Sequence, residues 1–514
     1  MIDYFCFATT SRRIQSNLSR LNTLRLRDSV LDPLLNRRDL FHWASGGVGG
    51  TALLSLLLRD GVVRAEPVRG EAGDPPPHHP AKVKRVIHVV ACGGVSQVDT
   101  FDYKPALAKY HGKSLDASEK PDVFFGKVGL LRKNDWEFKQ RGSSGLWISE
   151  LFPHLATVAD ELTVVRSMFA ETSNHTPATF QENTGFRLNG FPVVGAWTSF
   201  GLGAETEDLP AYVVIPDPRG LAAGGSINWT NGFLSARHQG VVIRSRGTPI
   251  EDIFPARPID AATERDSAAL LALLNDRHRR ERGDEVLAAR IRSYELAAKM
   301  QRVVPEVTNL ERETRAMHEQ YGIDGSATDD FGRACLLARR MLESGVRFVQ
   351  LFSGGAFGSP RINWDGHENM KQNHGQEAER IDKPLAGLIG DLRRRGMLDD
   401  TLILFTSEFG RTPFTQSAAD VVGDGRDHNQ YGFSIWMAGG GLKHGSAYGA
   451  TDEIGMRAID DRVSWHDLHA TVLHLLGIDH QRLTFYHNGI RRRLTDVSGQ
   501  VVRGILRSAP SRAI

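Results

Sequence analysis

Short runs of β-branched and aliphatic residues recur along the chain without strict alternation of apolar and polar positions. That pattern is typical of strands that are buried on both faces, as in a parallel sheet. Helical periodicity over 331–343 and 381–395 precedes two of these runs. The chain therefore predicts an α/β fold with helices packed on a sheet. The runs that predict strands are 86–91, 162–166, 211–215, 346–352, 401–406 and 433–438.

Two segments depart from this pattern. Residues 265–320 are rich in Ala, Leu, Arg and Glu, with a helical period that is broken near Pro305. We expect them to form a helical insertion, a hairpin laid over the sheet. Residues 104–150 show no clear period and predict a loop-rich insertion.

The amino terminus has the features of an export signal. Arg37 and Arg38 precede Phe41 and an apolar stretch, 44–58, that contains four glycines. This stretch is too short for a membrane-spanning helix, which needs about 20 apolar residues. A buried core helix is the alternative, but the glycines and the prolines that follow disfavour it.

These features predict export by the twin-arginine translocase to the periplasm or beyond, and a mature chain without a stable membrane span. The predicted parts are a signal peptide over 1–65, a Pro-rich linker over 66–83, one α/β domain over 84–500 and a tail over 501–514.

Composition excludes some classes of function. Lys and Arg number 63 against 61 Asp and Glu, so no basic field indicates nucleic-acid binding. The three cysteines have no CxxC spacing and form no even set, which argues against a zinc knuckle or a disulfide scaffold. The chemistry must come from the polar clusters at the strand ends.

The cluster after the first predicted strand contains Asp99 and Asp102. Either carboxylate can be a metal ligand, because ligands bind at the carboxyl ends of strands in open α/β sheets. A turn or helix-cap aspartate is the alternative for each of them.

Three later clusters add carboxylates and imidazoles. Asp365 and His367 lie two residues apart and can converge on one cation, with His374 as a weaker third ligand. Glu408 follows the strand at 401–406, and His428 precedes the strand at 433–438. A lone histidine is more often structural, but three such clusters favour a shared metal site.

Two further features indicate an anionic ligand. The polar turn at 173–176 opens a predicted helix, whose amino end attracts phosphate and other anions. His175 or Thr176 would then face the ligand, although a simple helix cap is the alternative. Arg411 can hold an anionic group through two nitrogens.

Several motifs resemble bacterial proteins of the domain of unknown function 1501. The resemblance covers most of residues 80–490, and it implies a distant branch of the alkaline phosphatase and sulfatase superfamily. Members of that superfamily have a sheet sandwiched between helices and use metal ions to hydrolyse phosphate or sulfate esters. The motifs are Val98–Pro105, Trp364–His367, Ser407–Pro413, Gly425–His428 and Ala438–Asp452.

The site residues match that superfamily unevenly. His175 stands at the nucleophile position of sulfatases, where it removes the precursor of formylglycine, so Thr176 is the alternative nucleophile. Glu408 stands where the superfamily has an Asp-His pair. Asp365 and His367 resemble its Asp-x-x-x-His ligands with shorter spacing, and His428 resembles its last histidine. The helix at 467–477 resembles a late helix of sulfatases.

Together these features predict an exported hydrolase of phosphate or sulfate esters that uses a divalent metal such as zinc, manganese or calcium. The expected metal ligands are Asp99 or Asp102, Asp365, His367, Glu408 and His428. His175 or Thr176 is expected to attack, and Arg411 to hold the anion. The substrate would be an anionic ester or a sulfated polysaccharide. The alternative is a non-catalytic member that binds such a polysaccharide or a partner protein.

Overall fold

The structure is a computed structural model that describes residues 77–115, 123–254, 259–282, 285–355, 357–358 and 361–507. The predicted signal peptide at 1–65 lies outside these residues, as do the first part of the predicted linker and the end of the predicted tail. Among the described helices, none is long and apolar enough to cross a membrane.

A mixed sheet forms the centre of the fold, with nine strands in the described chain. All six predicted strands are present in it. The order across the sheet is β12-β4-β11-β8-β1-β7-β5-β6, and β15 also pairs with β4. The strands are β1 Arg85–Ala91, β4 Leu162–Phe169, β5 Tyr212–Ile215, β6 Val241–Val242, β7 Phe348–Ser353, β8 Thr401–Thr406, β11 Phe433–Gly439, β12 Ser446–Tyr448 and β15 Val463–Ser464.

Most of the sheet is parallel, and β11 is the exception. The run β8-β1-β7-β5-β6 is parallel throughout, whereas β11 is antiparallel to both of its neighbours, β4 and β8. The amino end of β11 therefore lies at the same edge as the carboxyl ends of β1, β4, β7 and β8. Segments that follow those four strands and the segment that precedes β11 meet at this edge.

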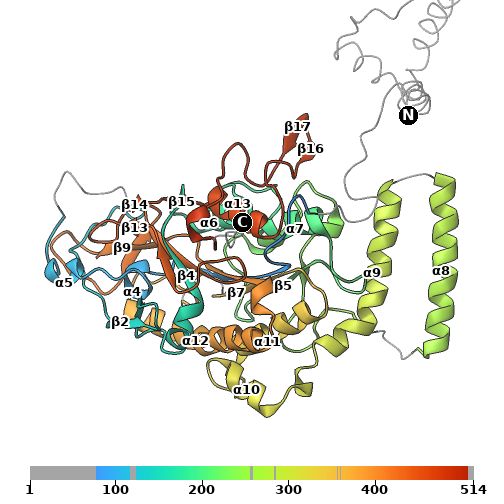
Figure 1. Ribbon diagram of the computed structural model, residues 1–514, viewed down its shortest axis with the longest axis horizontal. Helices are drawn as coiled ribbons and strands as arrows, with labels where there is room; N and C mark the ends of the chain where they lie inside the picture. The colour runs from blue at the N-terminus through green and yellow to red at the C-terminus, as the bar shows by residue number, and fades with distance from the viewer. Residues whose placement is uncertain are drawn as a thin grey trace, which may run out of the picture. The chain divides into compact units, whose positions relative to one another are not determined.

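Helices cover both faces of the sheet, as the sequence predicted (Figure 1). Val86 and Val90 of β1 belong to one core with residues of α7 and α13, while Ile87 and Val89 belong to a second core with residues of α11 and α12. Both cores are needed because both faces of β1 are apolar. The helices are α4 Gln97–Thr100, α5 Ala106–Lys109, α6 His175–Thr184, α7 Val194–Leu202, α8 Ala261–Arg282, α9 Glu285–Val307, α10 Arg315–Tyr321, α11 Asp329–Glu343, α12 Met370–Arg394 and α13 Trp465–Leu475.

The two helices of the expected insertion are present, but only the end of α9 packs against the core on one face of the sheet. Met300, Val304 and Val307, near the end of α9, join the core beside α11. Helix α8 contributes no residue to the core, and its Leu270 and Leu273 are 58% and 67% exposed. Figure 1 shows α8 beyond α9, away from the sheet. The predicted break near Pro305 corresponds to the end of α9 at Val307.

Four antiparallel strand pairs of the described chain lie outside the central sheet. The segment 104–150 contains α5 and the hairpin of β2 Phe138–Arg141 with β3 Leu146–Ser149. The hairpin of β9 Gly410–Thr415 with β10 Arg426–Asn429 connects β8 to β11 and pairs His428 with Arg411. The strands β13 Ala450–Thr451 and β14 Ala458–Asp460 pair in the same way, as do β16 Phe485–His487 and β17 Ile490–Arg492.

Candidate metal centre

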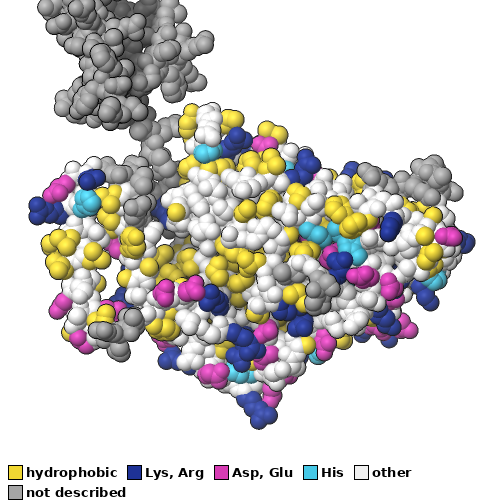
Figure 2. Space-filling model, turned by 180° about the vertical axis from the view of Figure 1, so that it is seen from behind, with side chains coloured by type: hydrophobic (Ala, Val, Ile, Leu, Met, Phe, Trp, Pro, Cys, Tyr) yellow, Lys and Arg dark blue, Asp and Glu magenta, His cyan; other side chains and the backbone are white. Residues whose placement is uncertain are grey.

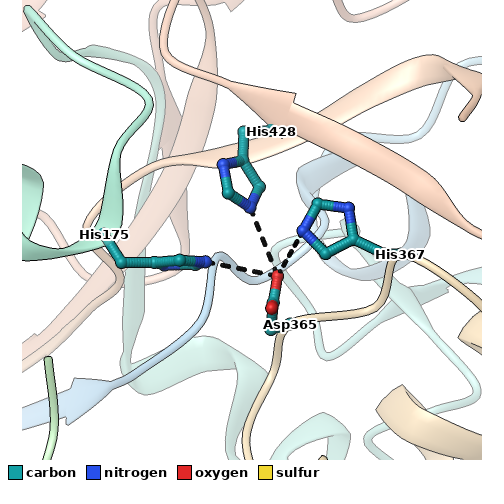
Figure 3. Close-up of side chains that lie close together, drawn as sticks. All are labelled: His175, Asp365, His367 and His428. Carbon is teal, nitrogen blue, oxygen red and sulfur yellow. Dashed lines mark hydrogen bonds and ion pairs between the residues drawn. The ribbon is translucent and has the colours of Figure 1, made fainter. Parts of the chain in front are cut away.

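Four side chains from three distant segments meet at the edge of the sheet described above: His175, Asp365, His367 and His428 (Figure 3). His175 begins α6 after β4, and Asp365 and His367 lie between β7 and α12. His428 lies on β10, directly before β11. The antiparallel direction of β11 is what brings His428 to the others, because a parallel strand would place it at the opposite edge.

One carboxylate oxygen stands at the centre of the group. Oδ1 of Asp365 lies 2.8 Å from Nε2 of His367, and 3.3 Å from Nε2 of both His175 and His428. All four atoms that could bind a cation lie within 4.8 Å of one another. The side chains of Asp365 and His428 are buried, and the other two are partly buried.

The other ring nitrogen of each histidine, Nδ1, donates a hydrogen bond to an oxygen. Nδ1 of His175 donates to Glu408 at 2.8 Å, and Nδ1 of His428 donates to the carbonyl of Ser173 at 2.6 Å. Nδ1 of His367 donates to Oε1 of Gln416. None of these oxygens has a hydrogen to give, so Nδ1 carries the proton in all three rings. Such partners fix the tautomer and orientation of metal-binding histidines.

Where a ring is neutral, it directs a bare Nε2 lone pair at the carboxylate oxygen, an arrangement that is repulsive without a positive charge between them. Burial lowers the pKa of His367 and lowers that of His428 still further, which keeps these two rings neutral. Burial also acts on His175, but the neighbouring carboxylates of Asp365 and Glu408 outweigh it and raise its pKa. Its Nε2 is a buried atom without a hydrogen-bond partner. The group needs a cation or added protons.

The distances from Asp365 to the three imidazoles are close to those between the ligands of a tetrahedral metal ion. Four ligands at about 2.0–2.2 Å from a zinc ion lie about 3.3–3.5 Å from one another. Two of the three contacts to Asp365 are 3.3 Å, and the third, to His367, is 2.8 Å. Three imidazoles and one carboxylate suit zinc, manganese or iron better than calcium, which prefers oxygen ligands.

Arg411 contacts Asp365 from within the protein interior. Its guanidinium is fully buried and lies 2.6 Å from Oδ1 of Asp365. Its Nε and Nη1 donate to the backbone carbonyls of Gly94 and Arg426, and Nη2, which contacts Asp365, also donates to the carbonyl of Gly93. With these contacts made, we place Arg411 as a support of Asp365 and not as the anion holder that the sequence predicted.

These charges keep Asp365 ionised. Burial opposes its ionisation, but the buried guanidinium of Arg411 favours the charged form, and the pKa of the carboxyl lies well below its usual range. A second arginine, Arg361, bonds to the other oxygen of Asp365, and its side chain is 30% exposed. Arg361 is the more accessible cation at this edge, and nothing in the sequence motifs singled it out.

Glu408 and His374 lie behind the group. Glu408 is fully buried and accepts hydrogen bonds from the backbone of Gly93 and from His175, so its carboxylate orients a histidine. His374 begins the second turn of α12, where its Nε2 accepts from the backbone of Ser96 at 3.1 Å. Burial lowers the pKa of His374 to about 3.

Asp99 and Asp102 are not brought to the group. Asp99 pairs with Arg426 at 2.8 Å and accepts from Ser96 at 2.6 Å. Asp102 pairs with Lys104 at 3.2 Å and accepts from Thr451. Both carboxylates have partners of their own, so we leave them out of the proposed ligand set. Thr176 is exposed at the start of α6, beside His175.

Two glycines let the backbone pass close to this centre. Gly93 has φ of +119°, and a Cβ there would meet the backbone nitrogen of Asp365 at 2.5 Å. A Cβ on Gly425 would meet the carbonyl oxygen of His367 at 1.8 Å. Any side chain at either position would push the segment carrying Asp365 and His367 away from the other ligands.

The family of the chain follows from its sequence motifs and is confirmed by comparison. The family described as protein of unknown function, DUF1501, matches residues 83–506. The chain belongs to the DUF1501 family. No curated protein matches this DUF1501 chain.

Solved structures similar to this DUF1501 protein match it only distantly. The lipoteichoic acid synthase LtaP of Listeria monocytogenes is 13% identical, with 80% of this chain and 76% of that chain covered and a TM-score of 0.37. The alkaline phosphatase of the Antarctic bacterium TAB5 is 9% identical, with 77% and 98% covered and a TM-score of 0.34. The sulfatase PsFucS1 of Pseudoalteromonas sp. is 13% identical, with 88% and 75% covered and a TM-score of 0.33. The reaction has to be argued from the site itself.

Proposed function

We propose that this protein is a metal-dependent hydrolase of phosphate or sulfate monoesters. The observation that carries the proposal is the set of three Nε2 atoms around Oδ1 of Asp365, each ring fixed from behind by an acceptor. Three imidazole nitrogens and one carboxylate oxygen form a ligand set that is suited to a divalent transition metal. We favour zinc or manganese over calcium.

In this proposal His175, Asp365, His367 and His428 are the ligands, while Glu408, Gln416 and Arg411 hold them in place. A divalent cation, when bound, supplies positive charge that polarises an ester oxygen and makes water more acidic. The amino end of α6 lies at the centre because the helix begins with His175. Its positive end favours an anionic ester there.

Water is the nucleophile in our proposal, because the four gathered side chains include no hydroxyl or thiol. Its oxygen bonds to phosphorus or sulfur, the bond to the alcohol oxygen breaks, and the alcohol leaves with the proton that the water has lost. The products are the alcohol and inorganic phosphate or sulfate. Thr176 is exposed next to His175 and is the alternative nucleophile.

A second function deserves a test on the same site. His175 occupies the position that the sequence assigned to a nucleophile, and in the structure its ring joins the proposed ligands. A centre with a metal but without an internal nucleophile also suits a non-catalytic protein that binds an anionic polysaccharide. Turnover separates the two functions, since both predict binding of metal and anion.

The decisive experiment is metal analysis of the purified protein with its His367→Ala variant. We expect bound metal in the parent, loss of most of it in the variant, and little change in thermal unfolding of the metal-free proteins. His278→Ala, which changes an exposed histidine on α8, is the matched control and should keep its metal.

Turnover is measured on an aryl phosphate and an aryl sulfate with the same three proteins. Release of phosphate or sulfate should follow the metal content. Metal-free parent protein with no turnover would overturn the proposal. A full complement of metal with no turnover of either ester would favour the binding protein.

Export by the twin-arginine translocase remains part of the proposal, supported by Arg37, Arg38 and the apolar stretch that follows. Changing both arginines to lysine should leave the precursor in the cytoplasm. Undiminished export of that variant, or an intact Met1 in exported protein by mass spectrometry, would contradict the predicted signal and its cleavage.

A further inference from the structure

Three phenylalanine rings flank the proposed metal ligands, and we call them the aromatic rim: Phe124, Phe125 and Phe357. The ring of Phe124 lies 5.0 Å from that of His428 at an interplanar angle of 34°. Phe125 meets His367 edge-on, at 5.0 Å and 89°. Phe357 lies 4.2 Å from His175. Each proposed ligand histidine therefore has a phenylalanine against it.

The rim is open to solvent rather than part of a core. Phe124 and Phe125 are 44% and 50% exposed, and they touch each other at 4.9 Å in a T-shaped pair. On the face shown in Figure 2, histidine side chains reach the surface next to hydrophobic ones. Exposed aromatic rings cost free energy in water, so a cluster of them beside a polar centre points to a ligand with an apolar face.

The backbone fixes the rim in relation to the metal ligands. Val123, just before the two phenylalanines, is buried in a small core with Leu107 and Leu131. The backbone N–H of Phe125 donates to Oδ2 of Asp427 at 3.3 Å, while Oδ1 of Asp427 accepts from the backbone of His428 at 2.7 Å. One carboxylate thus ties the rim to the strand that carries His428.

We propose that the substrates are monoesters of ring-bearing alcohols, whose ring packs against Phe124 and Phe125 while the ester group lies at the metal centre. The inference rests on the proposed function and adds the class of alcohol to it. The shared chemistry is a flat ring with an apolar face, found in aryl groups and on one side of a sugar. A partly exposed cation, Arg361, pairs with Asp365 and with Glu368 on this side and can also take the charge of the anion.

Binding of phosphonates, which cannot be hydrolysed, tests this without any turnover. Phenylphosphonate and methylphosphonate carry the same anionic group and differ in the ring. Titration calorimetry on the metal-loaded protein should show phenylphosphonate binding about tenfold more tightly, the size expected for one aromatic contact with the area it buries. A glycosyl phosphonate as third probe separates a sugar from an aryl source.

The variants Phe125→Ala and Phe125→Leu should lose the preference for the ring and keep the affinity for methylphosphonate. The leucine keeps an apolar side chain, so it holds the loop if the alanine disturbs it. Phe254→Ala is the matched control, because Phe254 is 54% exposed and is not one of the rim residues. It should keep the preference.

Equal affinity for the ring-bearing and methyl phosphonates in the parent, or a preference that survives in both Phe125 variants, would overturn the inference and leave the proposed function standing. Failure of every phosphonate to bind the metal-loaded protein would instead count against the proposed function, and the inference would fall with it.

Discussion

Two buried aspartate–arginine pairs of this fold look alike and behave differently. Asp99 pairs with Arg426, and Asp365 pairs with Arg411; both arginines are fully buried and lie on the β9–β10 hairpin. In the first pair, the other contact of the carboxylate is the hydroxyl of Ser96, which donates to it. In the second pair, Nε2 of three imidazoles also faces the carboxylate, and this atom lacks a hydrogen wherever the ring is neutral.

This difference separates a structural ion pair from a binding site. A carboxylate whose neighbours all donate hydrogen bonds needs no further partner. Burial opposes the ionisation of Asp99, but Arg426 and Ser96 favour it more strongly, so the pKa of Asp99 is lowered. A carboxylate that shares its space with further acceptors needs a positive charge from outside. Residue type alone does not distinguish the two, because both are buried aspartates near an arginine.

The largest effect should come from breaking the complete pair. Asp99→Asn leaves Arg426 charged and buried without its carboxylate, a change that typically costs about 3–5 kcal/mol of folding free energy. We expect urea unfolding to shift by that amount while the metal content stays that of the parent. A shift below about 1 kcal/mol would show that Arg426 is satisfied by carbonyls alone.

An intermediate effect, on metal affinity, is expected from removing a residue that supports the histidines around Asp365. Gln416→Ala removes the acceptor that fixes His367, and loss of such a support typically lowers metal affinity about 10–100-fold. Competition with a chelator measures the affinity, and the unfolding free energy of the metal-free protein should change little. Gln481→Ala, an exposed glutamine, is the control. Unchanged affinity in Gln416→Ala would mean that Asp365 alone orients His367.

The smallest effect is a pH dependence at His374, which accepts from Ser96 next to Asp99. Burial, helped by Arg411, lowers its pKa to about 3 from 6.5. Between these values the unfolded chain binds the extra proton, so the folded protein loses stability as the pH falls from 6.5 toward 3.

His374→Gln should remove this part of the pH dependence. The difference in unfolding free energy between parent and variant should shrink by at most about 1.4 kcal/mol for each pH unit below 6.5. Unfolding curves at pH 7.0, 6.0 and 5.0 measure it. A constant difference over this range would show that His374 takes up a proton in the folded state.

Much of the fold could be predicted from the sequence, because strands buried on both faces leave unbroken apolar runs. The runs at 86–91 and 401–406 became neighbouring strands at the centre of the sheet. The direction of β11 could not be predicted in this way, since an apolar run has no polarity. The exposure of α8 could not be predicted for another reason: exposed leucines give the same helical period as buried ones.

The sequence indicated which residues gather at the candidate site better than it indicated what each of them does. His175, Asp365, His367 and His428 were all singled out, but His175 was expected to attack rather than to join the other histidines. Asp99 and Asp102 satisfied the same rule, because each is a carboxylate that follows a strand. Their partners in the structure are Arg426 and Thr451, which lie more than 300 residues away along the chain. Sequence spacing carries no signal for such partners.

Hydrophobic periodicity does not predict the Phe124–Phe125 part of the aromatic rim, because the loop-rich segment 104–150 has no regular period. Phe124 and Phe125 are adjacent in a segment without helical or strand pattern. Two adjacent side chains of a regular strand point to opposite faces, so two adjacent phenylalanines cannot both be buried on one face by a regular alternation. That signal was available in the sequence.

Because the strand ends that build the metal centre all lie at one edge of the sheet, the opposite edge is a place for attachment. Arg394 is the last residue of α12, and its side chain is 58% exposed. The chain then enters β8 at Thr401, and the other end of that strand leads to Glu408. Cys92 and Cys335 are buried thiols. A cysteine introduced at Arg394 would therefore react selectively with a maleimide among the described residues, and would anchor the protein to a sensor surface with its centre facing the solution.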